Sequence, residues 1–122
     1  MNYERALTNA TKILKSASIK SSKLDCEILL SNVLKINREK MLVNLNKKIN
    51  HQDFVNFNKL INRRVKNEPV AYIVGYKEFW NKKFKVNFDV LIPRPDTEIL
   101  VEEVIKSIPI NRSLNILDIG TG

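Results

Sequence analysis

Along the first half of the chain, apolar residues recur at three- and four-residue spacing. Because this spacing places them on one face of an α-helix, it predicts amphipathic helices over residues 3–17 and 22–35, a short helix over residues 38–44, and a fourth helix that begins after Asn50. The residues predicted to line the buried faces are Tyr3, Leu7, Ala10, Ile13, Leu14 and Ala17, then Leu24, Ile28, Leu29 and Val33, then Met41, Leu42 and Leu45, and finally Phe54, Phe57, Leu60, Ile61 and Val65. Joined by turns rich in Asn and Lys, these helices form a small bundle.

Polar residues mark the predicted ends of these helices. Asn2 and Asn50 are typical N-caps, and the stretch Ser22–Asp25 has the pattern of a capping box with a shorter acid. Arg63 and Arg64, at the end of the fourth helix, suit the negative end of a helix dipole. A bundle of about 65 residues buries only a modest core, so we expect it to pack against another domain.

The pattern changes at Pro69, after which β-branched and aromatic residues typical of strands dominate. We predict a β-hairpin with strands at Phe79-Trp80 and residues 84–86 around a turn at residues 81–83. Both aromatic residues of the first strand are expected in the hairpin core. The hairpin would bridge the helical region and the rest of the chain.

A further helix and a strand are predicted after the hairpin. The helix starts at about Asp96, where Asp96 and Glu98 suit the positive end of the helix dipole, and Pro109 ends it. Residues 114–119 form a short apolar run that predicts a buried strand, with Gly120-Thr121-Gly122 as a glycine loop leaving it.

Charge and composition divide the chain at the same place as the pattern. The net charge is +8, and residues 1–66 carry 14 basic and 5 acidic side chains, whereas residues 67–122 carry 7 and 8. All the Gly and Pro residues lie at or after position 69. The basic residues are mostly Lys interleaved with Asn rather than Arg paired with aromatics, which favours a solvated surface or a protein partner over nucleic acid.

Several classes of protein are excluded by what the chain lacks. No window approaches the roughly 18 apolar residues of a spanning helix, and the first residues lack the order of a signal peptide, so we expect a cytoplasmic, monomeric protein that does not contact a membrane. Cys26 and His51 are the sole residues of their types, which leaves no internal disulfide, no zinc site and no catalytic pair. A length of 122 residues suits one small domain plus part of another rather than a complete two-domain enzyme.

The stretch from Asp118 to Gly122 carries the clearest chemical signal. A strand that ends in an acidic residue and a Gly-x-Gly turn lets the backbone approach a ligand closely, because glycine has no Cβ and tolerates positive φ. A nucleotide-type ligand is expected there, and an acid two positions before the first glycine favours S-adenosylmethionine over NAD. An ordinary glycine-rich turn is the alternative.

Four stretches together resemble a known family. They are Glu68-Pro69-Val70-Ala71-Tyr72-Ile73-Val74-Gly75, Glu78-Phe79-Trp80, Leu91-Ile92-Pro93-Arg94-Pro95-Asp96-Thr97-Glu98 and Ile116-Leu117-Asp118-Ile119-Gly120-Thr121-Gly122. In order and spacing, residues 63–122 resemble the release factor glutamine methyltransferases of the HemK/PrmC family, whereas residues 1–62 match in architecture alone. The resemblance implies an α+β chain: a helical substrate-recognition domain at residues 1–66, a β-hairpin linker at 67–90, and the start of a Rossmann-like methyltransferase domain at 91–122.

The resemblance also implies a reaction. Members of the family transfer a methyl group from S-adenosylmethionine to the side-chain amide nitrogen of the glutamine in the Gly-Gly-Gln loop of peptide chain release factors. An Asn-Pro-Pro-Tyr motif holds this poorly nucleophilic nitrogen in place, which is catalysis by positioning. The 122 residues contain neither that motif nor an acidic residue about 20 positions beyond the glycine loop that would bind the ribose. No catalytic residue is therefore assigned, and residues 1–122 alone are expected to be inactive.

Carried over residue by residue, the resemblance assigns two sets of site residues. The residues implied for S-adenosylmethionine are Asp118, Gly120, Thr121 and Gly122. Those implied for the acceptor pocket are Leu91, Ile92, Pro93 and Arg94, with Thr97 and Glu98 at the mouth of the following helix, where free N–H groups could face the cofactor. The alternative for Arg94 is a surface ion pair with Asp96 or Glu98.

Two other functions stay open. One is a nucleic-acid adenine methyltransferase, because adenine also offers an exocyclic amino nitrogen. The other is a protein-binding module made of the helical region alone.

Overall fold

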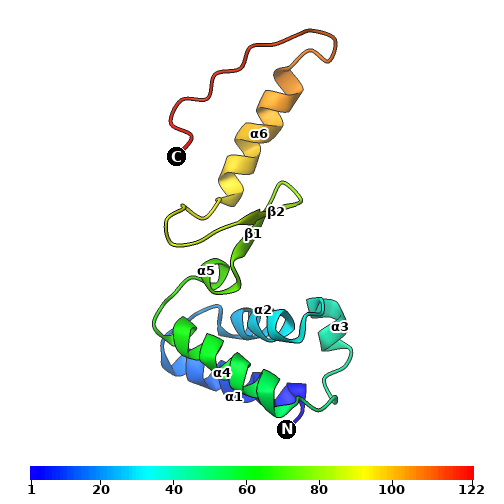
Figure 1. Cartoon of the computed structure of the whole chain (residues 1–122), viewed down its shortest axis with the longest axis vertical. Helices are drawn as coiled ribbons and strands as arrows, with labels where there is room; N and C mark the ends of the chain where they lie inside the picture. The colour runs from blue at the N-terminus through cyan, green and yellow to red at the C-terminus, as the bar shows by residue number, and fades with distance from the viewer. The chain divides into compact units, whose positions relative to one another are not determined.

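The structure, a computed structural model, describes every residue from Met1 to Gly122. The chain folds into two compact units, Met1–Val74 and Gly75–Gly122, called here the helical unit and the second unit (Figure 1). None of the helices combines the length and the apolar character that crossing a membrane demands.

The helical unit is a bundle in which one helix is central (Figure 1). Its helices are α1 (Tyr3–Ser16), α2 (Ser22–Leu34), α3 (Arg38–Leu42), α4 (His51–Val65) and α5 (Val70–Val74). Helix α2 packs against each of the other four, and α1 also packs against α4. The predicted helical bundle is confirmed, with the third helix shorter than expected.

Asparagine side chains start three of these helices. Asn2, Asn37 and Asn50 accept hydrogen bonds from the backbone N–H three residues further on, at 2.9, 2.9 and 2.7 Å. Each bond satisfies an N–H that has no partner inside its helix. The predictions for Asn2 and Asn50 are confirmed, whereas the cap at Asn37 was not predicted.

The start of α2 differs from the predicted capping box. The N-cap is Ser21, which makes no side-chain bond to the backbone, and Ser22 is the buried first residue of the helix. The Ser21 hydroxyl donates instead to the Asp25 carboxylate at 2.9 Å. The prediction was wrong because Asp25 also has a distant partner, described below, that the local pattern does not reveal.

The buried residues of the helical unit do not form one simple apolar stripe on each helix. The unit's buried apolar residues are Ala6, Ala10, Leu14, Ile19, Cys26, Leu29, Leu30, Met41, Phe57, Ile61 and Ile73. Ile13 and Leu24, both predicted to face inward, are 49% and 44% exposed. Helix α2 is covered by four neighbours, so it buries polar as well as apolar side chains and has no single apolar face.

A short helix replaces the extended structure expected directly after Pro69. The backbone carbonyl of Pro69 accepts hydrogen bonds from the N–H groups of Tyr72 and Ile73 at 3.0 and 3.1 Å, so that Val70–Val74 form α5. Proline is compatible with a helix start because its missing N–H would have no partner there. Ile73 is buried in the helical core, and this tertiary contact outweighs the strand preference of the β-branched residues.

The second unit begins with the predicted hairpin. Strands β1 (Tyr76–Phe79) and β2 (Lys82–Lys85) pair antiparallel, with Phe79 opposite Lys82. The turn is the pair Trp80-Asn81, whose φ angles of 51° and 55° are those of the type I′ turn, and not the three residues predicted. Phe79 is half-buried and meets Phe84 edge-on, but Trp80 is 37% exposed in the turn rather than in the core.

After the hairpin, the chain forms one more helix, α6 (Pro95–Ser107), close to the range predicted. The predicted strand at residues 114–119 is not formed: Ile116, Leu117 and Ile119 are 73%, 82% and 85% exposed in a segment without regular structure. The sheet contains β1 and β2 alone, so no strand lies beside this segment to supply a hydrogen-bonded ladder. A Rossmann-like arrangement of residues 91–122 therefore stays a prediction.

Candidate functional site

The segment Leu91–Arg94, predicted to line the acceptor pocket, connects the hairpin to α6. Ile92 and Pro93 are half-buried, whereas Leu91 is 77% exposed. Arg94 has an extended backbone at the N-cap position, and Pro95 begins the helix. Two prolines so close together stiffen the chain at this point, because each fixes its own φ and restricts the residue before it.

One hydrogen bond ties the start of α6 to the tip of the hairpin. The carboxylate of Glu98 accepts from the backbone N–H of Trp80 at 2.7 Å, across 18 positions of sequence. Glu98 was predicted to lie at the mouth of the acceptor pocket. In the structure, its carboxylate accepts this hydrogen bond from the tip of the hairpin.

The other residues at the start of α6 make local contacts. The N–H of Thr97 donates to the carbonyl of Arg94 at 3.1 Å, so it does not project freely from the helix end. Arg94 itself forms no ion pair, and the alternative of a pair with Asp96 or Glu98 was wrong. Its guanidinium is free to bind an acceptor carbonyl or carboxylate.

The residues predicted for S-adenosylmethionine lie in the irregular segment after α6. Asp118, Gly120, Thr121 and Gly122 are all exposed. Both glycines have positive φ, 77° and 85°, as a glycine loop requires, but no atom lies within 4 Å of a Cβ built at either. The loop is thus open at both glycines, and cofactor binding here stays a prediction.

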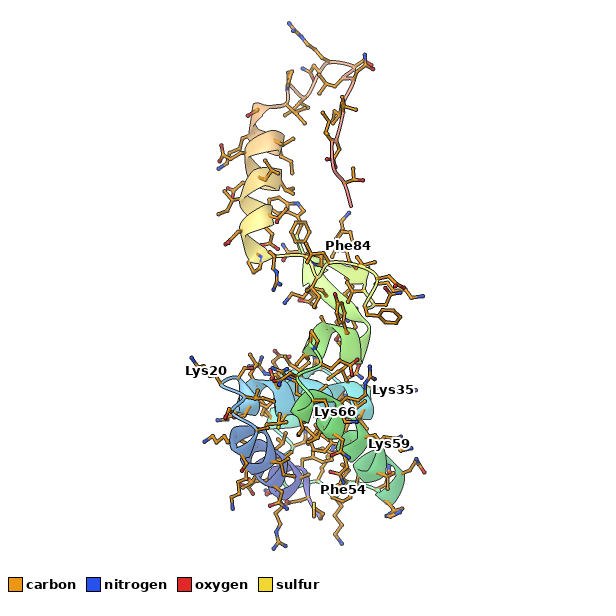
Figure 2. All side chains as sticks on the ribbon, turned by 90° about the vertical axis from the view of Figure 1, so that its left-hand side faces the viewer. Lys20, Lys35, Phe54, Lys59, Lys66 and Phe84 are labelled. Carbon is orange, nitrogen blue, oxygen red and sulfur yellow. The ribbon has the colours of Figure 1, made fainter.

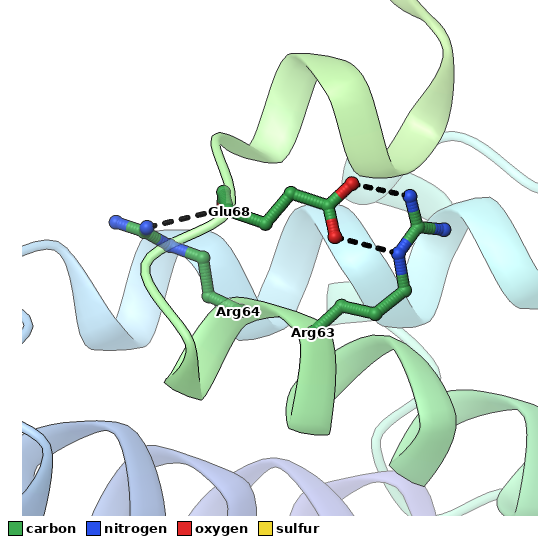
Figure 3. A network of polar contacts seen from close by, with 3 residues as sticks. All are labelled: Arg63, Arg64 and Glu68. Atoms are coloured by element: carbon green, nitrogen blue, oxygen red, sulfur yellow. Dashed lines mark hydrogen bonds and ion pairs between the residues drawn. The ribbon is translucent and has the colours of Figure 1, made fainter. Parts of the chain in front are cut away.

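In the helical unit, charged side chains join the end of α4 to its surroundings (Figure 3). Arg63 makes two hydrogen bonds to the Glu68 carboxylate, at 2.8 and 2.5 Å, which lower the pKa of Glu68 and raise that of Arg63. Arg64 donates to the backbone carbonyl of Glu68 at 3.2 Å, and its Nε lies 2.8 Å from Asp25 Oδ2. These arginines therefore act as hydrogen-bonded ion-pair partners and not merely as charges at a helix end.

The unpaired positive charge of the helical unit faces solvent. Lys20, Lys35, Lys59 and Lys66 are all exposed, and Figure 2 shows Lys20 and Lys35 reaching outward from the bundle. A hollow of about 450 Å³ along α1 is lined by Met1, Glu4, Arg5, Thr8 and Asn9. It contains none of the predicted site residues. The candidates considered below are the exposed lysines of the helical unit and the Leu91–Glu98 segment.

Comparison with known sequences identifies the helical unit. The profile of the PrmC N-terminal domain matches residues 5–75, almost the same range as the compact unit Met1–Val74. The chain belongs to the PrmC N-terminal domain family. The predicted resemblance to the HemK/PrmC methyltransferases is thereby confirmed, and it extends in sequence through the helical unit, where residues 1–62 had matched in architecture alone.

Relatives of this PrmC-family chain are named as methyltransferases. A release factor glutamine methyltransferase of Coxiella burnetii is 41% identical over 122 residues, which are 100% of this chain and 44% of the relative. One of Leptospira interrogans is 42% identical over 117 residues, 95% of this chain and 41% of the relative. A bifunctional methyltransferase of Rickettsia felis is 44% identical over 101 residues, 83% of this chain and 19% of the relative. The chain thus spans less than half the length of these relatives.

One contact of this PrmC-family domain was missed by sequence reasoning, whereas the interpretation of Cys26 as a small apolar helix residue is confirmed. The pairing of Asp25 with Arg64 joins residues 39 positions apart, and the one available signal was an acid inside an otherwise apolar stretch. The buried thiol of Cys26 has its pKa raised to about 11, chiefly by burial, with a hydrogen bond from Thr11 opposing the shift. A thiol so rarely ionised is a weak nucleophile, so Cys26 is a core residue.

Proposed function

We propose that this chain forms the amino-terminal part of a release factor glutamine methyltransferase. In this proposal the helical unit docks a peptide chain release factor, and the segment Leu91–Arg94 lies beside the glutamine of its Gly-Gly-Gln loop. The observation that carries the proposal is the match of the PrmC N-terminal domain to residues 5–75. The names of the relatives supply the reaction and its substrate.

The proposed chemistry divides the work between binding and methyl transfer. S-adenosylmethionine supplies the methyl group when it is bound, and Asp118, Gly120, Thr121 and Gly122 would begin its site. An amide nitrogen is a poor nucleophile, so the reaction depends on holding that nitrogen in place. The residues of this chain contribute docking and orientation, and no acid, base or nucleophile among them is assigned to the transfer.

Docking of the release factor is proposed to rest partly on charge. Exposed lysines, among them Lys20, Lys35 and Lys59, give the helical unit an excess of positive charge that would attract an acidic protein partner. A surface of isolated lysines around hydrogen-bonded helices offers no aromatic platform for bases, which favours protein over nucleic acid. Binding of this kind weakens as salt rises, because the Debye length falls from about 10 Å at 0.1 M to about 3 Å at 1 M.

The test is a binding titration of residues 1–122 with a purified release factor at low and high salt. We expect saturable binding that weakens with salt and that is lost on joint substitution of Lys20→Glu, Lys35→Glu and Lys59→Glu. The matched control reverses three exposed charges of the second unit, with Lys82→Glu, Lys85→Glu and Arg112→Glu, and should bind as the unchanged chain does. Failure of the unchanged chain to bind a release factor, or equal loss in both triple variants, would count against the proposal.

A second experiment separates binding from activity and tests the nucleic-acid alternative. Residues 1–122 and, separately, the complete methyltransferase are incubated with methyl-labelled S-adenosylmethionine and either a release factor or DNA. We expect no label from residues 1–122, because they contain no Asn-Pro-Pro-Tyr motif, and label in the release factor alone from the complete enzyme. Methylation by residues 1–122 would disprove the expected inactivity, and label in adenine from the complete enzyme would replace the proposal with the adenine methyltransferase.

A further inference from the structure

The hairpin turn holds two bulky residues in a conformation that favours glycine. Trp80 and Asn81 have φ angles of 51° and 55°, in the left-handed region where the Cβ of an L-residue crowds the backbone. Asparagine tolerates this region, but tryptophan has no local hydrogen bond to compensate for it. A turn of this composition persists when contacts from outside the turn hold it in place.

The contact from outside is made by Glu98. The ladder of the hairpin pairs Phe79 with Lys82, which leaves the N–H of Trp80 at the tip, beyond the last pair. This N–H donates to the Glu98 carboxylate at 2.7 Å. A hydrogen bond to a charged acceptor is stronger than one between neutral groups, so it suits the task of holding a strained turn.

The same bond closes a loop around the segment assigned to the acceptor pocket. Between Trp80 and Glu98 the chain runs through β2, then through residues 86–94, which form no helix or strand, and then into α6. Fixing the two ends of such a stretch reduces the conformations open to the residues inside it. Leu91–Arg94 lie inside this loop, next to the anchored start of α6.

We propose that Glu98 is a positioning residue for the acceptor pocket. It fixes the path of Leu91–Arg94 through its hydrogen bond to Trp80, and it does not itself contact the substrate. The assignment of Leu91–Arg94 to the acceptor pocket rests on the proposed function, but the bond between Glu98 and Trp80 does not. The two parts can therefore be tested separately.

The first test uses residues 1–122 and follows Trp80, the single tryptophan of the chain. Glu98→Ala should speed hydrogen exchange of the Trp80 amide by about tenfold, as expected for loss of a hydrogen bond to a charged group. It should also increase quenching of the indole fluorescence by acrylamide. Glu98→Gln keeps a carbonyl acceptor and should restore most of the protection. The control Glu103→Ala removes an exposed carboxylate of the same helix whose partner is Lys106, and should leave Trp80 unchanged.

Far-UV circular dichroism is used to check that each variant retains its helices. With the fold intact, unchanged exchange of the Trp80 amide in Glu98→Ala overturns the proposal, whatever the activity of the enzyme. Equal exchange in the Gln and Ala variants also overturns it, because a carbonyl acceptor is sufficient for the positioning described.

The second test measures methylation kinetics in the complete methyltransferase. Glu98→Ala should lower kcat/KM for the release factor by about tenfold, the equivalent of one such hydrogen bond, and leave the KM for S-adenosylmethionine unchanged. Glu98→Gln should recover most of the loss. The positioning role is overturned if Glu98→Ala keeps the kcat/KM of the unchanged enzyme while hydrogen exchange of the Trp80 amide becomes faster. Absence of any release factor methylation in the unchanged enzyme instead disproves the proposed function, and the result at Trp80 still stands.

Discussion

Arg64 and Asp25 form an ion pair that joins α4 to α2 inside the helical unit. Arg64 Nε lies 2.8 Å from Asp25 Oδ2, and their side chains are only 17% and 7% exposed. The same carboxylate accepts from Ser21 at 2.9 Å, and the same guanidinium donates to the carbonyl of Glu68 at 3.2 Å. The pair thus fixes α2, the end of α4 and the connection to α5 with satisfied hydrogen bonds.

Arg64→Ala should destabilise the helical unit strongly, because it leaves the Asp25 carboxylate shielded from water without its cation. Losses of about 3–5 kcal/mol are usual when one partner of such a buried pair is removed. The neighbouring Arg63→Ala is the control, since Arg63 pairs with Glu68 at the surface, where a pair contributes about 1 kcal/mol or less. Urea denaturation followed by circular dichroism measures both. Equal losses in the two variants would show that the buried pair has no special role.

The buried thiol of Cys26 should make the protein less stable at high pH. Burial raises the pKa of this thiol from an ordinary value of 9.0 to about 11. Because the folded pKa is the higher one, the contribution is fully present below pH 9 and is lost as pH rises through 11. The loss is about 1.4 kcal/mol per pH unit across that window. Comparing the free energy of unfolding of the unchanged chain with that of Cys26→Ala cancels the other titrating groups. A difference that does not vary between pH 9 and 11 would contradict the expectation.

Removing the cap of α4 should cost less than breaking the buried pair. Asn50 accepts from the N–H of Asp53 at 2.7 Å, and α4 carries Phe57 and Ile61 into the core. Asn50→Ala removes that acceptor and should lower stability by about 1 kcal/mol, whereas Asn50→Ser keeps a good cap without placing a second carboxylate beside Asp53 and should be nearly neutral. Thermal unfolding of both variants tests this, and an equal loss from the serine variant would argue that side-chain capping is unimportant here.

The helices could be predicted from sequence because their signals are local. Apolar spacing predicted α1 and α4, and Asn2 and Asn50 marked where they begin. The same reasoning failed for Leu24, which is 44% exposed, because a helix surrounded by four neighbours has no single apolar face. Local pattern therefore predicts the position of a helix better than it predicts which side is buried.

The parts that could not be predicted depend on distant partners. Val70–Val74 have strand-forming residues but form a helix, because Ile73 packs into a core built by other segments. Residues 114–119 have the composition of a buried strand but lack a neighbouring strand to pair with. Glu98 was predicted to belong to the site, yet its bond to Trp80 spans 18 positions and has no local signature. Sequence thus gives the candidate residues, and tertiary contacts decide what they touch.

Asn81→Gly should stabilise the hairpin without disturbing Glu98. Asn81 is the second residue of the turn, with φ of 55°, and Asn or Gly at such positions is what the type I′ turn requires. Glycine adopts positive φ without steric cost, which should gain up to about 1 kcal/mol after its larger backbone entropy is counted. Asn81→Val is the opposing control, since a β-branched residue fits this region poorly and should destabilise the turn. The neighbouring Trp80 reports both changes by fluorescence during thermal unfolding. If valine stabilised the turn as much as glycine, the left-handed geometry of Asn81 would be refuted. A higher midpoint of thermal unfolding for the glycine variant and a lower one for the valine variant would support the strained turn that Glu98 is proposed to hold.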